Sequence, residues 1–354
     1  GMAAGPTIAA VLALTTLGVG PTGATDDGGA VRAAGACGTV VVSEASTNTL
    51  TTIDVATRTQ SPTGIHVGDL PVGVATTPDA TTAIVADFLA DQVSFVDLAT
   101  RTEVATVSVG MQPYGVGITP DGALAFVTNY AGASVSVIDV ATRTVVGAPI
   151  AVGTQPWAVV FSADGATAFV SNSGSNTVST IDVATRTKDP VDINVAGTPS
   201  GLALTPDGTQ LWVALNGASA VATIDVATRT KNPVDIDVGT GPAGVAITHD
   251  GSTAFVANNG TDTVSVVDVV GRTVVGSPIT VGSGPRSPAL TTDGSTLYVV
   301  AQNDGEVATI DVATRVVTGP NLTVGVGALG LAITRCAPEP PPAPAPPDEP
   351  TFTG

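Results

Sequence analysis

A phrase of seven residues, Ile-Asp-Val-Ala-Thr-Arg-Thr with small variations, recurs seven times in this chain and constrains its fold more than any other feature. Successive copies are 42 or 43 residues apart, measured between Asp54, Asp97, Asp139, Asp182, Asp225, Asp268 and Asp311. Short apolar runs bounded by Gly, Pro and Asn lie between the copies, as expected for strands and turns. A period of this length is that of a four-stranded propeller blade. We therefore predict an all-β, seven-bladed β-propeller with antiparallel blades.

The composition and the extent of the repeats predict one domain. Hydrophobic residues make up 43% of the 354 residues but aromatic residues only 3%, so Val, Ala, Ile and Leu must form the core. Strands buried on both faces read as nearly continuous apolar runs, as at residues 264–267. The repeats predict a propeller over residues 37–336, after a leader at 1–36 and before a Pro-rich tail at 337–354.

Both ends of the chain suggest export. Residues 7–19 form an apolar stretch typical of a signal-peptide core, and the small residues that follow suit cleavage after Ala24. The stretch is too short to span a bilayer, so we expect no membrane span. The Pro-rich tail favours a stiff polyproline spacer that tethers the propeller to another domain or to the envelope. We expect a secreted or cell-envelope protein; a lipoprotein anchored at Cys37 is the poorer alternative.

The two cysteines fall at neighbouring positions of one composite hairpin. Counted along the repeat, Cys37 takes the place of a turn glycine and Cys336 that of the turn aspartate before it. The closing blade then combines a C-terminal inner strand at 330–334 with N-terminal strands that begin at Thr39. A disulfide between Cys37 and Cys336 would lock this ring and would agree with an oxidising compartment. The alternative is two free buried thiols.

Each repeat has the same turn chemistry. Asp-Gly pairs such as Asp121-Gly122 favour tight hairpins, because glycine adopts a positive φ without strain. The repeat aspartates are expected to order their turns by accepting hydrogen bonds from backbone N–H groups. An arginine stands four residues after each aspartate, and we expect these arginines to be solvated caps on their own turns: Arg58, Arg101, Arg143, Arg186, Arg229, Arg272 and Arg315.

Three repeats contain a recognisable phrase shortly before their Ile/Val-Asp pair: Phe126-Val-Thr-Asn129, Phe169-Val-Ser-Asn172 and Phe255-Val-Ala-Asn258. These segments resemble the YVTN-type repeat of the YncE-like seven-bladed β-propellers found in bacterial envelopes and archaeal surface layers. The resemblance covers the whole repeat region and departs at Leu215 and Ala301, where the Asn is replaced. It implies a propeller fold and an exported location, but no single shared reaction.

One position varies between repeats where the rest of the repeat is constant. The residue after the loop proline is expected at the mouth of the central channel, and its identities are Val72, Tyr114, Trp157, Ser200, Ala243, Arg286 and, where the proline itself is lost, Leu329. Symmetric parts of a ring hold it together, whereas asymmetric parts can recognise a ligand. This position therefore marks the predicted working face.

Tyr114 and Trp157 fall in consecutive blades, and the predicted ligand site is built around them. Gln112 and Gln155 flank them, and Tyr130 lies on a neighbouring loop. Aromatic rings beside amides suit a sugar, a peptide or another flat polar ligand. Arg286, across the channel, suits a carboxylate. The alternative is that Tyr114 and Trp157 only plug the channel.

Other side chains give little support to catalysis. His66 and His249 fall on different elements, and neither is accompanied by a Cys, Asp or Glu set at metal-ligand spacing, so we expect no metal site and no cofactor. Asp87 and Glu44 replace the repeat Asn and would face one another across adjacent blades. A calcium site or a carboxylate pair is conceivable there, although solvated acids are the common case.

These observations favour a binding or scaffold module whose partner is a protein, peptide or glycan at the cell envelope, with the propeller itself monomeric. Nucleic acid is excluded as a partner by the net charge of −18, which repels phosphate backbones. Two alternatives stay open: a propeller enzyme, quinoprotein-like or lyase-like, with its site over the channel, and a structural surface-layer or adhesion unit.

Overall fold

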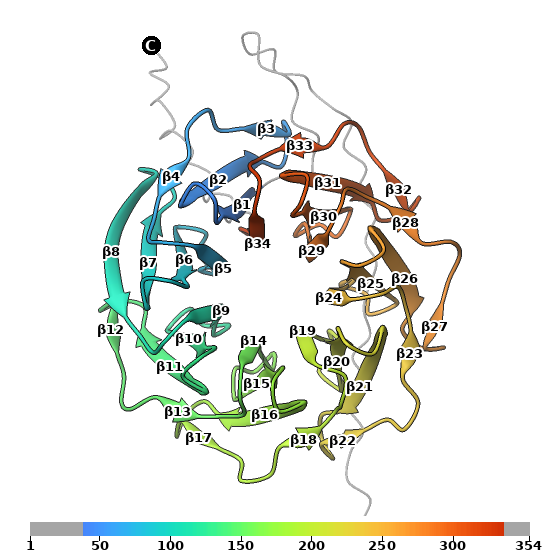
Figure 1. Cartoon of the computed structure of the whole chain (residues 1–354), viewed down its shortest axis with the longest axis horizontal. Helices are drawn as coiled ribbons and strands as arrows, with labels where there is room; N and C mark the ends of the chain where they lie inside the picture. The colour runs from blue at the N-terminus through green and yellow to red at the C-terminus, as the bar shows by residue number, and fades with distance from the viewer. Residues whose placement is uncertain (1–37, 336–354) are drawn as a thin grey trace, which may run out of the picture. The chain divides into compact units, whose positions relative to one another are not determined.

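The computed structural model describes residues 38–335, which form seven β-sheets arranged radially around a central opening (Figure 1). Each sheet is one antiparallel blade, and the blades follow one another around the ring in chain order. The predicted seven-bladed propeller is confirmed. The predicted leader, the Pro-rich tail and both cysteines lie outside the described residues.

The blades are numbered 1 to 7 by their inner strands, which line the opening: β34 (Ala328–Ile333), β5 (Pro71–Thr76), β9 (Pro113–Ile118), β14 (Pro156–Phe161), β19 (Pro199–Leu204), β24 (Pro242–Ile247) and β29 (Pro285–Leu290). The second strands are β1 (Thr39–Glu44), β6 (Thr82–Asp87), β10 (Leu124–Asn129), β15 (Thr167–Asn172), β20 (Gln210–Leu215), β25 (Thr253–Asn258) and β30 (Thr296–Ala301). The third strands are β2 (Thr49–Asp54), β7 (Gln92–Asp97), β11 (Ser134–Asp139), β16 (Thr177–Asp182), β21 (Ala220–Asp225), β26 (Thr263–Asp268) and β31 (Glu306–Asp311).

The outer strand distinguishes blade 2 from the other six blades. In blade 2 it is continuous, as β8 (Thr102–Ser108). In the other blades it consists of two short pieces: β3 (Thr59–Gln60) and β4 (Ile65–His66), β12 (Thr144–Val145) and β13 (Ile150–Ala151), β17 (Thr187–Lys188) and β18 (Ile193–Asn194), β22 (Thr230–Lys231) and β23 (Ile236–Asp237), β27 (Thr273–Val274) and β28 (Ile279–Thr280), β32 (Val316–Val317) and β33 (Leu322–Thr323). Such short edge strands offer little backbone to a foreign sheet.

Blade 1 closes the ring by joining the two ends of the described chain. Its inner strand β34 pairs with β1, with Val40 opposite Ile333. Beyond the last pair, the Thr39 N–H donates to Thr334 Oγ1 at 2.8 Å, and the Thr334 N–H donates to the Thr39 carbonyl at 2.9 Å. The predicted composite blade is therefore confirmed.

The core lies between neighbouring blades. Phe126 of blade 3 is fully buried and packs in one cluster with Val170 and Ile181 of blade 4. Phe169 and Phe255 occupy the same repeat position and are buried in the same way against the next blade. Each such side chain contributes about 1.5 to 3 kcal/mol by leaving water. Because these contacts bridge two sheets, a blade is stable only beside its neighbours.

The repeat aspartates order their turns as predicted. Asp54 Oδ1 accepts the backbone N–H of Thr57 at 2.8 Å, and Asp139 does the same for Thr142 at 2.7 Å. The Asp-Gly hairpins also form as expected, and Gly122 has a φ of 76°.

The described residues contain no helix long and apolar enough to cross a bilayer.

The prediction that the turn arginines are solvated caps on their own turns was wrong. All seven have φ values between 53° and 59°, and several side chains reach back to the preceding blade. Arg58 of blade 1 donates to Thr309 Oγ1 of blade 7 at 2.6 Å, and Arg229 of blade 5 pairs with Asp189 of blade 4. Arg58 and Arg229 therefore link adjacent blades, whereas Arg315, with the same backbone conformation, has no side-chain hydrogen bond or ion pair within residues 38–335. Sequence spacing alone could not show this direction.

Candidate functional site

The inner strands of all seven blades surround a cavity of about 230 Å³ on the central axis. Six of the seven predicted channel-mouth residues line it: Val72, Tyr114, Trp157, Ala243, Arg286 and Leu329. Each comes from a different inner strand, directly after the residue that begins it. The repeat therefore places one variable side chain per blade around a common opening.

The turn before each inner strand holds the channel-mouth residues in place. Gln112 and Gln155 both have a φ of 53° in this turn. The Gln112 carbonyl accepts the Tyr130 N–H at 2.8 Å, and the Gln155 carbonyl accepts the Ser173 N–H at 2.9 Å. The backbone of each glutamine thus joins the entry turn of a blade to the next loop on the same face.

A glycine allows the channel-mouth residues of adjacent blades to lie close together. A Cβ on Gly115 would lie 2.2 Å from the carbonyl oxygen of Trp157, a distance that no side chain tolerates. The same carbonyl accepts a hydrogen bond from Thr128 Oγ1 of blade 3 at 3.0 Å. Trp157 is therefore fixed against blade 3 by its backbone, and its ring is brought beside Tyr114.

Four aromatic side chains form one cluster at the channel mouth. The ring centroids of Tyr114 and Trp157 are 4.1 Å apart, and Tyr130 lies 5.9 Å from Tyr114 and 6.3 Å from Trp157. The fourth ring is Phe88, 6.1 Å from Tyr114 in an edge-to-face contact. We call Phe88, Tyr114, Tyr130 and Trp157 the aromatic wall.

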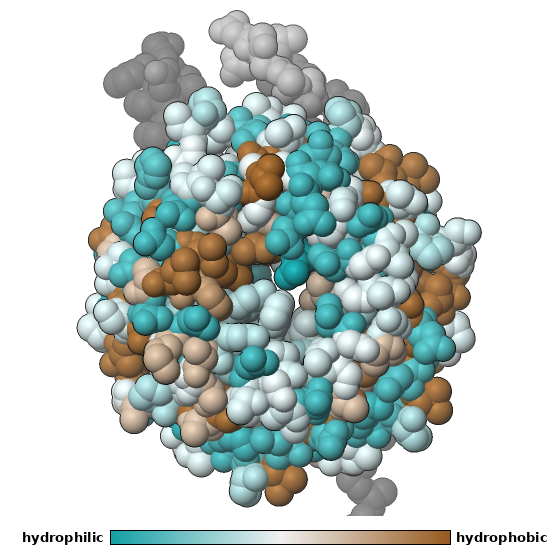
Figure 2. Space-filling view, in the orientation of Figure 1, coloured by the Kyte–Doolittle hydropathy of each residue, from teal (hydrophilic) through white to brown (hydrophobic). Residues whose placement is uncertain are grey.

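Phe88 was not among the site residues predicted from the sequence. It follows Asp87 just as Tyr130 follows Asn129, so its place in the repeat was the signal that could have identified it. The next residue, Leu89, is 63% exposed, and Met111, which precedes Gln112, is 57% exposed. Figure 2 shows hydrophobic surface beside the central opening on the side of β5 and β6, and hydrophilic surface on the opposite side.

Arg286 lines the same cavity as Tyr114 and Trp157 of the aromatic wall but belongs to blade 7. Burial raises the pKa of the Tyr114 phenol to about 12, even though the Arg286 guanidinium acts to lower that pKa through its charge and a hydrogen bond to the phenol. The Nε atom of Arg286 is buried and has no hydrogen-bond partner within residues 38–335. A buried donor without an acceptor is unfavourable and is available to a ligand. Stacking surface and positive charge therefore share one cavity.

The acids and histidines do not assemble into a second site. Glu44 accepts a hydrogen bond from Thr49 Oγ1 at 3.2 Å within blade 1, while the Asp87 carboxyl group lies 2.7 Å from Ser94 Oγ within blade 2, so the two carboxyl groups have separate partners. His66 lies on β4, and His249 lies in the turn between β24 and β25, as predicted. Across the described range, no group of three or more His, Cys, Asp and Glu side chains is placed to hold a metal ion.

A comparison with known protein families identifies the family to which this propeller belongs. The model of the YncE-like β-propeller family matches residues 7–338. The chain belongs to this family, which confirms the resemblance seen in the repeats. No curated protein matches the sequence.

Solved structures share the fold at low sequence identity. The periplasmic gluconolactonase PpgL of Pseudomonas aeruginosa has a TM-score of 0.71 and 18% identity, over 84% of this chain and 99% of that one. A putative 6-phosphogluconolactonase of Bacteroides uniformis has a TM-score of 0.73 and 16% identity, over 84% and 99%. Hydrazine synthase of Kuenenia stuttgartiensis has a TM-score of 0.68 and 22% identity, over 76% and 91%. At such identities these likenesses establish the fold alone.

Proposed function

We propose that this chain is an exported recognition module whose channel mouth binds a carboxylate-bearing glycan or peptide. The observation that carries the proposal is that Tyr114 and Trp157 of the aromatic wall line one cavity together with Arg286. Aromatic faces bind sugar rings and flat side chains, and a guanidinium binds a carboxylate through paired hydrogen bonds. Binding requires only this shape and these anchors.

The charge of the chain sharpens this choice of ligand. The net charge is −18, and Arg286 is nevertheless placed in the channel with a buried donor that no residue of 38–335 satisfies. A general negative field repels anions, so a cation at the channel mouth selects a ligand whose negative group fits that position. We expect neutral analogues of the ligand to bind more weakly than acidic ones.

Export is supported by the leader-like sequence, and tethering to the envelope by the Pro-rich tail. The structural neighbour PpgL is a periplasmic protein, in agreement with an exported location. Secretion of the full chain in a bacterial host, followed by sequencing of the mature N-terminus, tests this part of the proposal.

The binding proposal is tested by screening the full chain against arrays of acidic and neutral glycans and peptides. Hits are compared with a Tyr114→Ala, Trp157→Ala, Arg286→Ala triple variant, and Arg315→Ala serves as a control far from the channel. We expect acidic ligands to be lost in the triple variant and kept in the control. Ligands that bind both proteins equally would contradict a channel-mouth site and favour a structural surface role.

The same variants decide between recognition and catalysis. Because one structural neighbour is a gluconolactonase and another a putative 6-phosphogluconolactonase, hydrolysis of gluconolactone is the assay to run alongside the arrays. Turnover by the wild type that disappears in the triple variant would replace the recognition proposal by an enzymatic one.

A further inference from the structure

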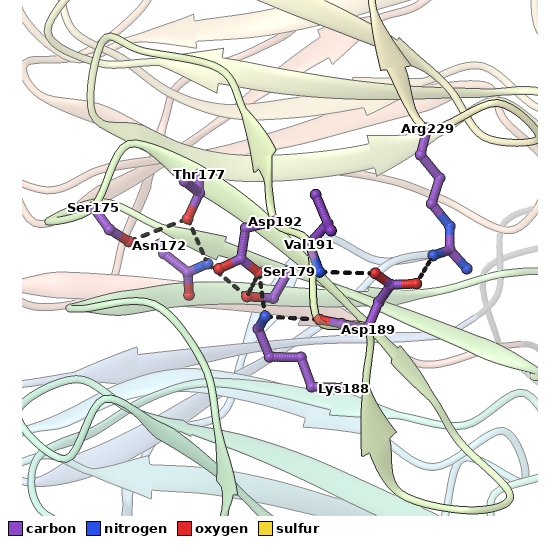
Figure 3. Close-up of polar contacts among 9 residues, drawn as sticks. All are labelled: Asn172, Ser175, Thr177, Ser179, Lys188, Asp189, Val191, Asp192 and Arg229. Atoms are coloured by element: carbon purple, nitrogen blue, oxygen red, sulfur yellow. Dashed lines mark hydrogen bonds and ion pairs between the residues drawn. The ribbon is translucent and has the colours of Figure 1, made fainter.

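The blades that keep the repeat Asn share a hydrogen bond from this Asn to a serine, and in blade 4 it extends into a directed relay. In blade 4 the amide nitrogen of Asn172 donates to Ser179 Oγ at 2.9 Å, and Ser179 Oγ donates to Asp192 Oδ1 at 2.8 Å (Figure 3). Lys188 Nζ completes it, 2.7 Å from the same Asp192 oxygen. The first two members recur in blades 3 and 6, where Asn129 donates to Ser136 at 3.0 Å and Asn258 to Ser265 at 2.9 Å.

Blade 2 has the same relay with carboxyl groups at both ends. Asp87 takes the place of the Asn and Ser94 that of the serine, while Glu103 on β8, at the repeat position of Lys188, supplies the final carboxyl group. Ser94 Oγ lies 2.7 Å from Asp87 Oδ2 and 2.6 Å from Glu103 Oε1. A serine hydroxyl has one hydrogen and can donate to only one of these oxygens. With both carboxylates ionised, one of the two short contacts would have no proton, so one carboxyl group must carry it.

Burial identifies the carboxyl group that carries the proton. Asp87 is fully buried, and its Oδ1 atom has no hydrogen-bond partner in the described part of the chain, whereas Glu103 is exposed on the outer strand. A buried charge costs far more than an exposed one. Asp87 also occupies the position from which Asn172 donates. A protonated Asp87 restores the direction of the relay, from Asp87 to Ser94 to Glu103.

We propose that Asp87 is a proton-operated latch for the loop that carries Phe88: with its proton it donates to Ser94 and holds the loop, and on losing the proton it breaks the relay and loosens Phe88 from the aromatic wall. The inference concerns the loop itself and does not require that a ligand binds. If the proposed recognition is also correct, the latch makes that recognition sensitive to pH.

Short contacts couple Asp87 to the loop that follows it. The Asp87 carbonyl accepts the Ala90 N–H at 3.1 Å, and the Phe88 N–H donates to the Leu70 carbonyl at 3.0 Å. A Cβ on Gly68 would lie 2.5 Å from Asp87 Oδ2, so the segment that leads to Leu70 packs directly on this carboxyl group. A negative charge on Asp87 would therefore act on both the loop that contains Phe88 and the Gly68–Leu70 segment that holds it.

The groups around Asp87 set the direction of its titration. Burial, with a smaller contribution from the Glu103 charge, raises the pKa of Asp87 to about 7, although hydrogen bonds from Ser94, Gln92 and the Gly68 amide act to lower it. Glu103 is the one ionisable side chain among these neighbours. Asp69 in the adjoining segment accepts a hydrogen bond from Asn48 Nδ2 at 2.8 Å, and Asp91 accepts one from the Gln112 N–H at 2.7 Å.

The sign of the stability change follows from this raised pKa. Between about pH 4 and 7 the native protein keeps a proton that the unfolded chain has lost, because an aspartate in an unfolded chain titrates near 4. The contribution of Asp87 to stability is therefore most favourable at and below about pH 4, declines as pH rises through about 7, and then levels off.

The test is a pH titration from 5 to 9 of the full chain labelled with ¹³C at aspartate carboxyl carbons, followed by NMR and by tryptophan emission. We expect one carboxyl signal to titrate near 7 in the wild type, to be absent in Asp87→Asn, and to move to lower pH in Glu103→Gln. Emission should change over the same range, because Trp157 contacts Tyr114, which contacts Phe88. Trp212 is fully buried in blade 5 and should emit constantly.

Each outcome decides the proposal. If all aspartates titrate below about 5, Asp87 is ionised at neutral pH and the latch is excluded. If the carboxyl titrates near 7 but Trp157 emission does not follow, the proton is present without control of the loop, and the latch is again excluded. Glu103→Gln changes an exposed side chain and keeps the test decisive even if Asp87→Asn fails to fold.

Discussion

The rings of Tyr114 and Trp157 lie 4.1 Å apart although they belong to adjacent blades. Their contact depends on the backbone beneath them, because Gly115 lets the Trp157 carbonyl approach to a position that a side chain would occupy. The aromatic wall is thus a consequence of how closely two inner strands pack. A ring of similar blades becomes a candidate site where aromatic side chains occupy neighbouring channel-mouth positions.

Gly115→Ala should separate these two blades. The added Cβ would overlap the Trp157 carbonyl, and overpacking of this kind costs about 2 to 3 kcal/mol. Urea unfolding followed by circular dichroism measures the loss. Ala158→Gly is the matched control, because Ala158 holds the same repeat position in blade 4, and it should cost only about 0.5 to 1 kcal/mol. Equal effects of the two variants would show that the close approach is unimportant.

Arg58→Ala should weaken the closure of the ring. Arg58 joins blade 1 to blade 7 through Thr309 Oγ1 and the Pro320 carbonyl, and the loss of such charged hydrogen bonds costs about 1 to 2 kcal/mol. Arg315 has the same backbone conformation, with a φ of 59°, and no side-chain hydrogen bond or ion pair to any described residue. Arg315→Ala should therefore change the unfolding midpoint less. A larger loss in Arg315→Ala would contradict the role of Arg58.

Acid should destabilise the propeller through its turn aspartates. Hydrogen bonds from Thr248 and from the backbone and hydroxyl of Ser252 lower the pKa of Asp250 to about 2, and the pKa values of Asp121 and Asp207 are lowered for the same reason. A lowered pKa stabilises the fold above about pH 4, and this stabilisation is lost as pH falls towards 2. Urea midpoints from pH 5 to 2 should decline, and Asp250→Asn should make the decline shallower. An unchanged slope in that variant would be evidence against this origin.

Cys37 and Cys336 should form a disulfide in the exported protein. Both lie outside the described residues, but the adjoining segments meet where Thr39 and Thr334 exchange hydrogen bonds at 2.8 and 2.9 Å. Closing so long a loop stabilises a fold by up to about 5 kcal/mol. Intact mass after alkylation without reductant should show no added label, and two labels after reduction. Labelling of both thiols without reductant would rule the bond out.

Much of the fold and part of the candidate site could be predicted from the sequence. The spacing of the repeat aspartates determined the number of blades, because each copy encodes one sheet that cannot bury its faces alone. The Asp-Gly turns and the composite closing blade followed from the same repeat. Tyr114, Trp157 and Arg286 were found by comparing one repeat position, since a symmetric ring places equivalent positions around one axis.

Only the tertiary structure decided how residues of different blades meet. It added Phe88 to the aromatic wall and directed Arg58 and Arg229 to the preceding blade. Within blade 2, it placed Ser94 between two carboxyl groups. A repeat determines what each blade is made of, because strand and turn chemistry is local. The distances between blades depend instead on packing across the ring, where one glycine, Gly115, allows two inner strands to approach closely.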